Sequence, residues 1–144
     1  MRAITNLFRA FVLMCTASAG VAVAQNPDMV TAGGWFLGTP TGARANFGLN
    51  ASEDLTGHLN YIDHGISMHV ESTSITSYTI VDFRTRTFTG TCTINGVGGF
   101  TFTCTLVDFA EPGHHADTFE LTLSNGYHAL GSISGGNVQV HPAG

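Results

Sequence analysis

The chain has 144 residues, no lysine, five arginines and ten acidic residues, which gives a net charge of −5. An excess of negative charge opposes phosphate-rich partners, because nucleic-acid affinity depends on lysine and arginine displacing counterions. The composition therefore excludes nucleic acid and anionic membranes as expected partners.

The amino terminus has the pattern of a secretory signal peptide over residues 1–24. Arg2 and Arg9 flank a short positive region, and Ala10–Val23 is apolar and rich in small residues. That stretch is shorter than the ~20 residues needed to span a bilayer, so it is not a membrane anchor. A small-x-small triplet ends at Ala24, which predicts cleavage before Gln25. We expect an exported protein, periplasmic, extracellular or surface-associated, with no transmembrane segment in the mature chain.

The mature chain, residues 25–144, keeps three arginines and ten acidic residues, so its net charge falls to −7. Apolar residues recur at period two and are separated by turn-type residues. The pattern predicts one all-β domain over 29–144, an antiparallel β-sandwich or closed β-barrel of about eight to ten strands. Residues 25–28 are expected to form a loose leader. The expected strands are Met29–Leu37, Ala43–Leu49, Gly57–Asp63, Ile66–Ser74, Ser77–Phe83, Arg86–Ile94, Phe100–Asp108, Thr118–Leu123, Tyr127–Ser134 and Asn137–His141.

Glycines mark the expected irregularities of the sheet. Gly33-Gly34 lies inside the first strand and predicts a bulge or a close backbone approach. Asn125-Gly126 and Gly135-Gly136 lie between expected strands and predict tight turns.

Asp63, His64, His69 and Glu71 form the densest group of chemically active side chains in the first half of the chain. On a strand Asp63 and His64 point to opposite faces, whereas His69 and Glu71 share one. A solvated sheet face is the favoured interpretation. No nucleophile elbow, phosphate-binding loop or zincin motif accompanies the group. We therefore expect no catalytic residues and no enzyme.

Aromatic residues permit two interpretations. Amphipathic rings can form a stacking platform for sugars, and the candidates are Trp35, Phe36, Tyr61, Tyr78 and Tyr127. Most aromatic side chains of a small β-domain lie in its core, and the pattern places there Phe47, Phe88, Phe102, Phe119 and Trp35. Any ligand-binding site is expected to use Asp63, His69, Tyr61 and Tyr127.

The centre of the chain is expected to form a β-hairpin. If its turn is centred on Gly98, Cys92 lies directly opposite Cys104 on the buried face. Opposed cysteines at a non-hydrogen-bonded site approach closely enough for a disulfide, which is expected in an oxidising compartment. A structural disulfide between Cys92 and Cys104 is the favoured interpretation, and a catalytic or metal-binding thiol pair is the alternative.

Threonines occupy the other face of this hairpin, at positions 85, 87, 89, 91, 93, 101, 103 and 105. Such ladders are also a feature of ice-binding surfaces. Threonine is an ordinary choice for a solvated sheet face, however, and strand twist would spoil a flat lattice match. The solvated face is the favoured interpretation.

The segment from Asp108 to Asp117 is an acidic loop that holds Asp108, Glu111, Gly113, His114, His115 and Asp117. Oxygen-rich loops that contain glycine suit calcium, and a histidine would favour zinc or copper. The candidate metal ligands are Asp108, Glu111, Asp117 and His114, with calcium as the first candidate ion. An acidic, solvated hairpin loop is the competing interpretation, and on balance we expect no required cofactor.

Many short segments of the mature chain resemble the post-COAP domain, a family of exported bacterial β-domains associated with choice-of-anchor surface proteins. The matching segments are Val30–Trp35, Ala43–Gly48, Gly57–Gly65, His69–Ser74, Ile94–Phe100, Glu111–Gly113, Asp117–Phe119, Leu123–Tyr127 and Gly135–His141. The resemblance implies a secreted or surface-attached β-domain with no established activity. This chain departs from the family by standing alone behind a signal peptide. It also carries Cys92 and Cys104 where other members have small or apolar residues.

The sequence thus predicts a non-catalytic cell-surface or extracellular β-domain that contributes to adhesion, surface assembly or envelope attachment. Its partner would be an extracellular or envelope glycan or protein, and free edge strands would pair copies into a homo-oligomer. The alternative is a small-ligand- or metal-binding β-barrel with hydrolytic activity around the Asp108–Asp117 loop.

Overall fold

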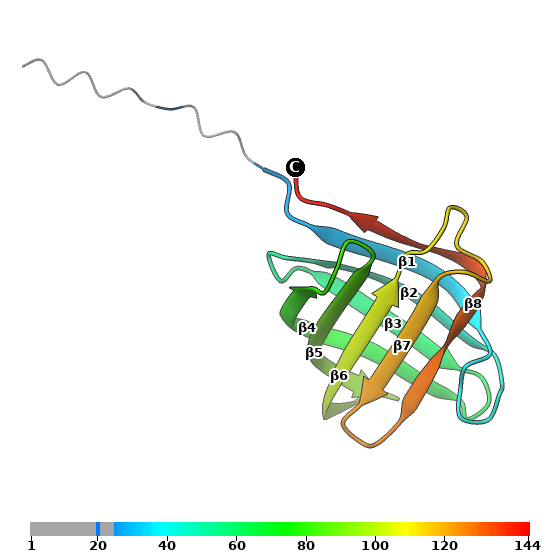
Figure 1. Ribbon diagram of the computed structural model, residues 1–144. Helices are drawn as coiled ribbons and strands as arrows, with labels where there is room; N and C mark the ends of the chain where they lie inside the picture. The colour runs from blue at the N-terminus through cyan, green and yellow to red at the C-terminus, as the bar shows by residue number, and fades with distance from the viewer. Residues whose placement is uncertain (1–19, 21–24) are drawn as a thin grey trace, which may run out of the picture.

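The computed structural model describes residue 20 and residues 25–144, so the expected signal peptide, apart from residue 20, lies outside the described residues. Eight antiparallel strands follow one another around a closed barrel, and the last strand pairs with the first (Figure 1). The strands are β1 (Met29–Phe36), β2 (Ala45–Ser52), β3 (Gly57–Asp63), β4 (Met68–Ile80), β5 (Thr85–Ile94), β6 (Val97–Val107), β7 (Thr118–Leu123) and β8 (His128–His141). The prediction of an all-β fold, with a closed barrel as one of its two forms, is confirmed.

Two long strands replace four of the shorter strands that the sequence predicted. β4 continues through two register shifts, between Ser72 and Ser74 and between Ile75 and Ser77, where the sequence suggested a break. β8 continues through Gly135-Gly136, so the predicted turn there is wrong. A Cβ on Gly136 would collide with the β1 backbone. This glycine therefore permits the close approach of β8 to β1 and does not form a turn. The predicted Asn125-Gly126 turn is present between β7 and β8.

The long strands allow one sheet to wrap around the core. β4 pairs with β3 only from Met68 to Glu71 and with β5 from Val70 to Ile80. β8 pairs with β7 in its first half and with β1 in its second. As a result, β5–β7 cross the direction of β1–β3 (Figure 1). The ring leaves no strand unpaired along a whole side, although parts of β3, β4, β6 and β8 pair on one side alone. The expected free edge strands are therefore absent among β1–β8.

The central hairpin has a different register from the predicted one. Asn95 and Gly96 form its two-residue turn with φ angles of 49° and 80°, and Ile94 pairs with Val97. Positive φ at both central residues is the geometry that favours Asn-Gly in hairpins. Cys92 consequently pairs with Phe100, and Cys104 pairs with Phe88. The predicted pairing of the two cysteines is wrong because it placed the turn at Gly98.

Both cysteines are buried free thiols, so the predicted disulfide is absent from the structure. Cys104 lies four residues along β6 from Phe100, the partner of Cys92. Four residues of strand span about 13 Å, whereas a disulfide requires Cα atoms within about 7 Å. The faces were nevertheless predicted correctly, since Cys92 and Cys104 both point into the core.

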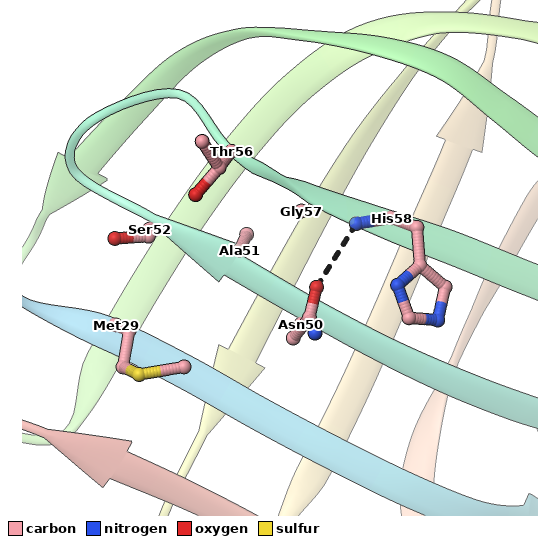
Figure 2. Close-up of a pocket in the computed structure, with 7 residues that line it drawn as sticks. All are labelled: Met29, Asn50, Ala51, Ser52, Thr56, Gly57 and His58. Carbon is pink, nitrogen blue, oxygen red and sulfur yellow. Dashed lines mark hydrogen bonds between the residues drawn. The ribbon is translucent and has the colours of Figure 1, made fainter.

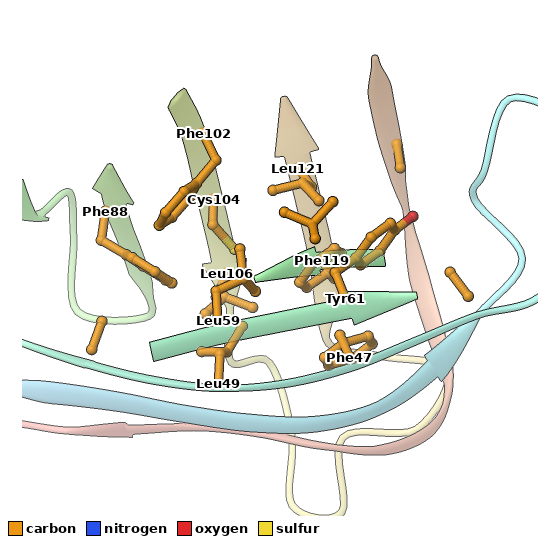
Figure 3. Packing of buried hydrophobic residues seen from close by; sticks show 14 of the residues in the cluster. Phe47, Leu49, Leu59, Tyr61, Phe88, Phe102, Cys104, Leu106, Phe119 and Leu121 are labelled. Atoms are coloured by element: carbon orange, nitrogen blue, oxygen red, sulfur yellow. The ribbon is translucent and has the colours of Figure 1, made fainter. Parts of the chain in front are cut away.

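Aromatic side chains fill the interior of the barrel (Figure 3). The rings of Phe47 and Tyr61 stack on Phe119 with centroids 4.4 Å and 5.7 Å away, and Phe36 packs edge-on against the same ring. Each fully buried side chain of this size contributes about 1.5–3 kcal/mol. The predicted core positions Phe47, Phe88, Phe102 and Phe119 are buried.

A buried ion pair ties the segment before β1 to the far side of the barrel. Arg86 donates to both carboxylate oxygens of Asp28, over 2.7 and 2.8 Å, and each side chain is 3% exposed. Tyr78 donates to the same carboxylate over 2.5 Å. The Arg86 hydrogen bonds hold the pKa of Asp28 below its ordinary value. Residues 25–28 are therefore anchored at Asp28 and are not the loose leader that the sequence suggested.

Candidate functional site

The acidic loop between β6 and β7 is organised around the buried carboxylate of Asp117. Its Oδ1 accepts the backbone N–H of Phe109 over 2.8 Å and that of Ala110 over 3.2 Å. Its Oδ2 accepts the N–H of Val138 in β8 over 2.9 Å. Asp117 thus accepts hydrogen bonds from backbone N–H groups of the loop and of β8. These bonds satisfy both oxygens of its buried carboxylate.

The other predicted metal ligands are dispersed along the same loop. Asp108 accepts the N–H of Val140 over 3.0 Å, and Glu111 accepts from the Asn137 amide over 2.7 Å. His114 lies exposed, with its ring edge-on to that of His115. Across residues 20 and 25–144, no three His, Cys, Asp or Glu side chains are placed to hold a metal ion. The structure does not bring Asp108, Glu111, His114 and Asp117 together as one ligand set.

Three of the four predicted ligand-binding residues meet at the opposite end of the barrel. Tyr127 donates to Asp63 Oδ2 over 2.8 Å, and the hydroxyls of Tyr61 and Tyr127 lie 2.6 Å apart. Because Tyr127 gives its proton to Asp63, Tyr61 is the donor between the two hydroxyls. Burial raises the pKa of both phenols well above their ordinary value. Asp63 and Tyr61 are fully buried, so this chain of hydrogen bonds closes the barrel end from within.

His69, the fourth predicted residue, lies apart on the outer wall. Its Nε2 is 2.9 Å from Asn60 Oδ1, and His64 Nε2 is 2.8 Å from Asn46 Oδ1. Asp63 and His64 point to opposite faces, as the strand alternation predicted, and Glu71 is exposed. Asp63 therefore lies in the interior, whereas the other three members of that polar group, His64, His69 and Glu71, lie on the outside.

A shallow open hollow of about 340 Å³ lies on the outer wall of β1–β3 (Figure 2). Met29 of β1 and His58 of β3 border it. Asn50 and Ser52 border it from β2, and Thr56 from the loop between β2 and β3. Asn50 Oδ1 accepts the backbone N–H of His58 over 3.1 Å, as the dashed line in Figure 2 shows. The hollow was not predicted from the sequence.

The wall beside this hollow consists of asparagines around a glycine. Gly48 has Asn46 and Asn50 two residues away on β2, Asn60 opposite on β3 and Gly33 opposite on β1. Alternation places all of these on the outer face. We define the asparagine face as the outer surface formed by Gly33, Asn46, Gly48, Asn50, His58 and Asn60. Its Asn-x-Gly-x-Asn spacing was readable in β2, but the contribution of β3 required the register.

The aromatic rings do not form a platform on the surface. Trp35 points outward, contrary to its predicted place in the core, and Arg44 lies over its ring at 4.5 Å. A Cβ on Gly135 would collide with the indole, so the β8 backbone also lies against this ring. The hydroxyls of Tyr61, Tyr78 and Tyr127 are all engaged in internal hydrogen bonds.

The threonines of β5 and β6 face outward as predicted and pair across the strands. Thr87, Thr89 and Thr91 lie opposite Thr105, Thr103 and Thr101. Several hydroxyls bond to one another, as at Thr87 and Thr105 over 2.9 Å. This outer face is polar and uncharged, which is usual for a solvated sheet.

Comparison of the chain with protein-family models, with curated proteins and with solved structures gives no match. Within residues 20 and 25–144, no helix has the length and apolarity to cross a bilayer.

Proposed function

We propose that this protein is an exported, non-catalytic β-barrel domain that attaches to a cell surface or an extracellular material through its outer wall. The attachment contributes to adhesion, surface assembly or envelope anchoring. The filled interior is the observation that carries the proposal. Phe36, Phe47, Tyr61 and Phe119 occupy the space that a ligand-carrying barrel keeps open.

The interior polar groups support the same conclusion. Asp63 and Asp117 are fully buried, and their oxygens accept hydrogen bonds from the protein itself. A catalytic acid or base must reach a proton of the substrate, and these carboxylates are turned away from solvent. The outer wall, by contrast, presents amides, imidazoles and hydroxyls in quantity.

The leader pattern and the resemblance to post-COAP domains add to the proposal. Both are typical of proteins that work outside the cytoplasm on a surface. The excess of acidic residues favours a partner that does not depend on phosphate, such as an envelope glycan or a protein.

The test is binding of purified protein to cells of the producing strain from which the gene has been deleted. We expect saturable sedimentation of the protein with these cells. We also expect the secreted or surface fraction of the parent strain to contain the chain without residues 1–24. Retention of the protein in the cytoplasm, or failure to sediment with cells at any concentration, would overturn the proposal.

A further inference from the structure

We propose that the asparagine face, together with the hollow beside it, is a binding site for an uncharged glycan. The inference rests on the attachment function proposed above and names the ligand class and the surface.

Three asparagines present amide N–H groups on this face. Asn46, Asn50 and Asn60 each use the side-chain oxygen to accept from a neighbouring residue, at distances of 2.8–3.1 Å for the closest donor. Within the described residues their amide nitrogens have no hydrogen-bond partner in the structure. Three amide donors without a protein partner therefore lie next to Gly48 on the same face of the sheet.

The two glycines of the face are not required by the fold. Gly33 and Gly48 have no positive φ. A Cβ on Gly48 would meet open space, and one on Gly33 would make only an ordinary contact with the Phe47 carbonyl oxygen at 3.9 Å. Glycine within a strand costs about 0.5–1 kcal/mol relative to alanine. Glycines that the backbone does not need are typical of places where a ligand approaches a strand closely.

The glycine pair and the hollow form one continuous surface. Asn50 borders both, because it lies two residues from Gly48 and also lines the hollow with His58. From Asn60 on β3 to Gly33 on β1 the face spans two interstrand spacings, about 9.5 Å in all. This width accommodates a sugar ring lying flat on the glycines.

The chemistry of the face selects an uncharged, hydroxyl-rich ligand. Amide N–H groups donate to sugar hydroxyls, and the imidazole of His58 can accept from them or donate to them. Three charged side chains border the face and the hollow. Arg44 is stacked on Trp35 and donates to Asn46 Oδ1 over 3.3 Å, Asp54 accepts from Thr56, and Glu71 lies opposite Asn60 on β4. The two carboxylates oppose an anionic ligand. β1 and β2 around Gly48, and β3 from Asn60 onward, already pair on both sides, so a peptide cannot be added as a further strand beside Gly48. Arg44 lies over the Trp35 indole and Gly135 lies against it, so recognition relies on hydrogen bonds.

The test is native affinity electrophoresis of the purified protein in gels that contain dextran, mannan or arabinogalactan, with polygalacturonate as the charged control. Gly48→Thr fills the floor of the face with a residue that favours strands. Gly98→Thr is the matched control, because Gly98 also has open space around its Cβ and no positive φ but lies on β6. Asn60→Asp removes one amide donor while keeping the oxygen that faces His69.

We expect at least one neutral polysaccharide to retard the wild-type protein and the Gly98→Thr control equally. Gly48→Thr and Asn60→Asp should weaken binding by about tenfold or more, and the melting temperature of Gly48→Thr should be unchanged or higher. Binding by Gly48→Thr at wild-type strength would overturn the location of the site. Retardation by polygalacturonate alone, or by no polysaccharide, would overturn the ligand class. If the protein still sediments with cells in that case, the attachment function stands without the glycan site, and if it does not, both fail.

Discussion

Replacing Arg86 by methionine tests whether the buried ion pair holds the start of the chain on the barrel. Methionine keeps most of the length of the side chain but removes both hydrogen bonds to Asp28, leaving a carboxylate that is 3% exposed without its countercharge. Breaking a buried pair in this way costs about 3–5 kcal/mol. At a urea m-value of about 1.5 kcal/mol/M, the unfolding midpoint should fall by about 2–3 M. Arg84→Met is the matched control, because Arg84 is exposed and its guanidinium lies over the rings of Phe83 and Phe109, so we expect a loss below about 1 kcal/mol.

The pH dependence separates lost charge pairing from lost packing. In the wild-type protein the pKa of Asp28 is lowered, so its stabilising effect is complete above the ordinary value of 3.8 and is lost as the pH falls through the lowered pKa. In Arg86→Met the Asp28 carboxyl keeps the Tyr78 hydrogen bond but loses the hydrogen bonds and charge of Arg86, so burial raises the pKa of Asp28 relative to wild type. The variant should therefore lose less stability, relative to wild type, at pH 4 than at pH 7, by up to about 1.4 kcal/mol for each pH unit. Equal losses at pH 4 and pH 7 would refute the reasoning and leave packing as the cause.

Three further predictions concern the barrel interior and its loops. Gly113→Ala should lower the free energy of unfolding by about 2–4 kcal/mol, because its Cβ would displace the Asp117 carboxylate from the loop amides, and chemical denaturation will measure the loss. The three tyrosines have raised pKa values, so in an ultraviolet titration their phenols should stay protonated past pH ~10 until the barrel unfolds in alkali; ionisation near pH 10 in the folded protein would contradict their burial. The two buried thiols of the β5–β6 hairpin should react with a thiol reagent only after denaturation without reductant, and an unreactive denatured protein would show that they are bridged.

Strand alternation in the sequence was sufficient to predict the inner and outer faces of most strands. It placed Phe88, Cys92 and Cys104 inside and the hairpin threonines outside, as the structure has them. The register was missed because the turn was centred on Gly98, whereas it lies at Asn95-Gly96. Asn-Gly is the stronger hairpin signal, so this part of the fold was readable.

Other features depend on contacts between segments that are distant in the chain. Alternation puts Arg86 on the inner face, but its partner Asp28 lies 58 residues away and cannot be identified from the pattern. The continuation of β4 and β8 through their bulges follows from closure of the barrel, which no single segment specifies. The asparagine face likewise needs the β2–β3 register, because only pairing places Asn60 opposite Gly48.

The two ends of the barrel chain leave it side by side, which determines how it responds to mechanical force. Met29 pairs with His141, and beyond them Asn26 and Gly144 exchange backbone hydrogen bonds of 2.9 and 3.3 Å. β1 and β8 are antiparallel, so a force that pulls the two ends apart loads their hydrogen bonds one pair at a time, in unzipping geometry. A force between one end and a ligand on the outer wall instead divides among several interstrand ladders. The barrel should therefore unfold at a higher force when it is pulled between one terminus and a ligand on the outer wall than when it is pulled between its two termini.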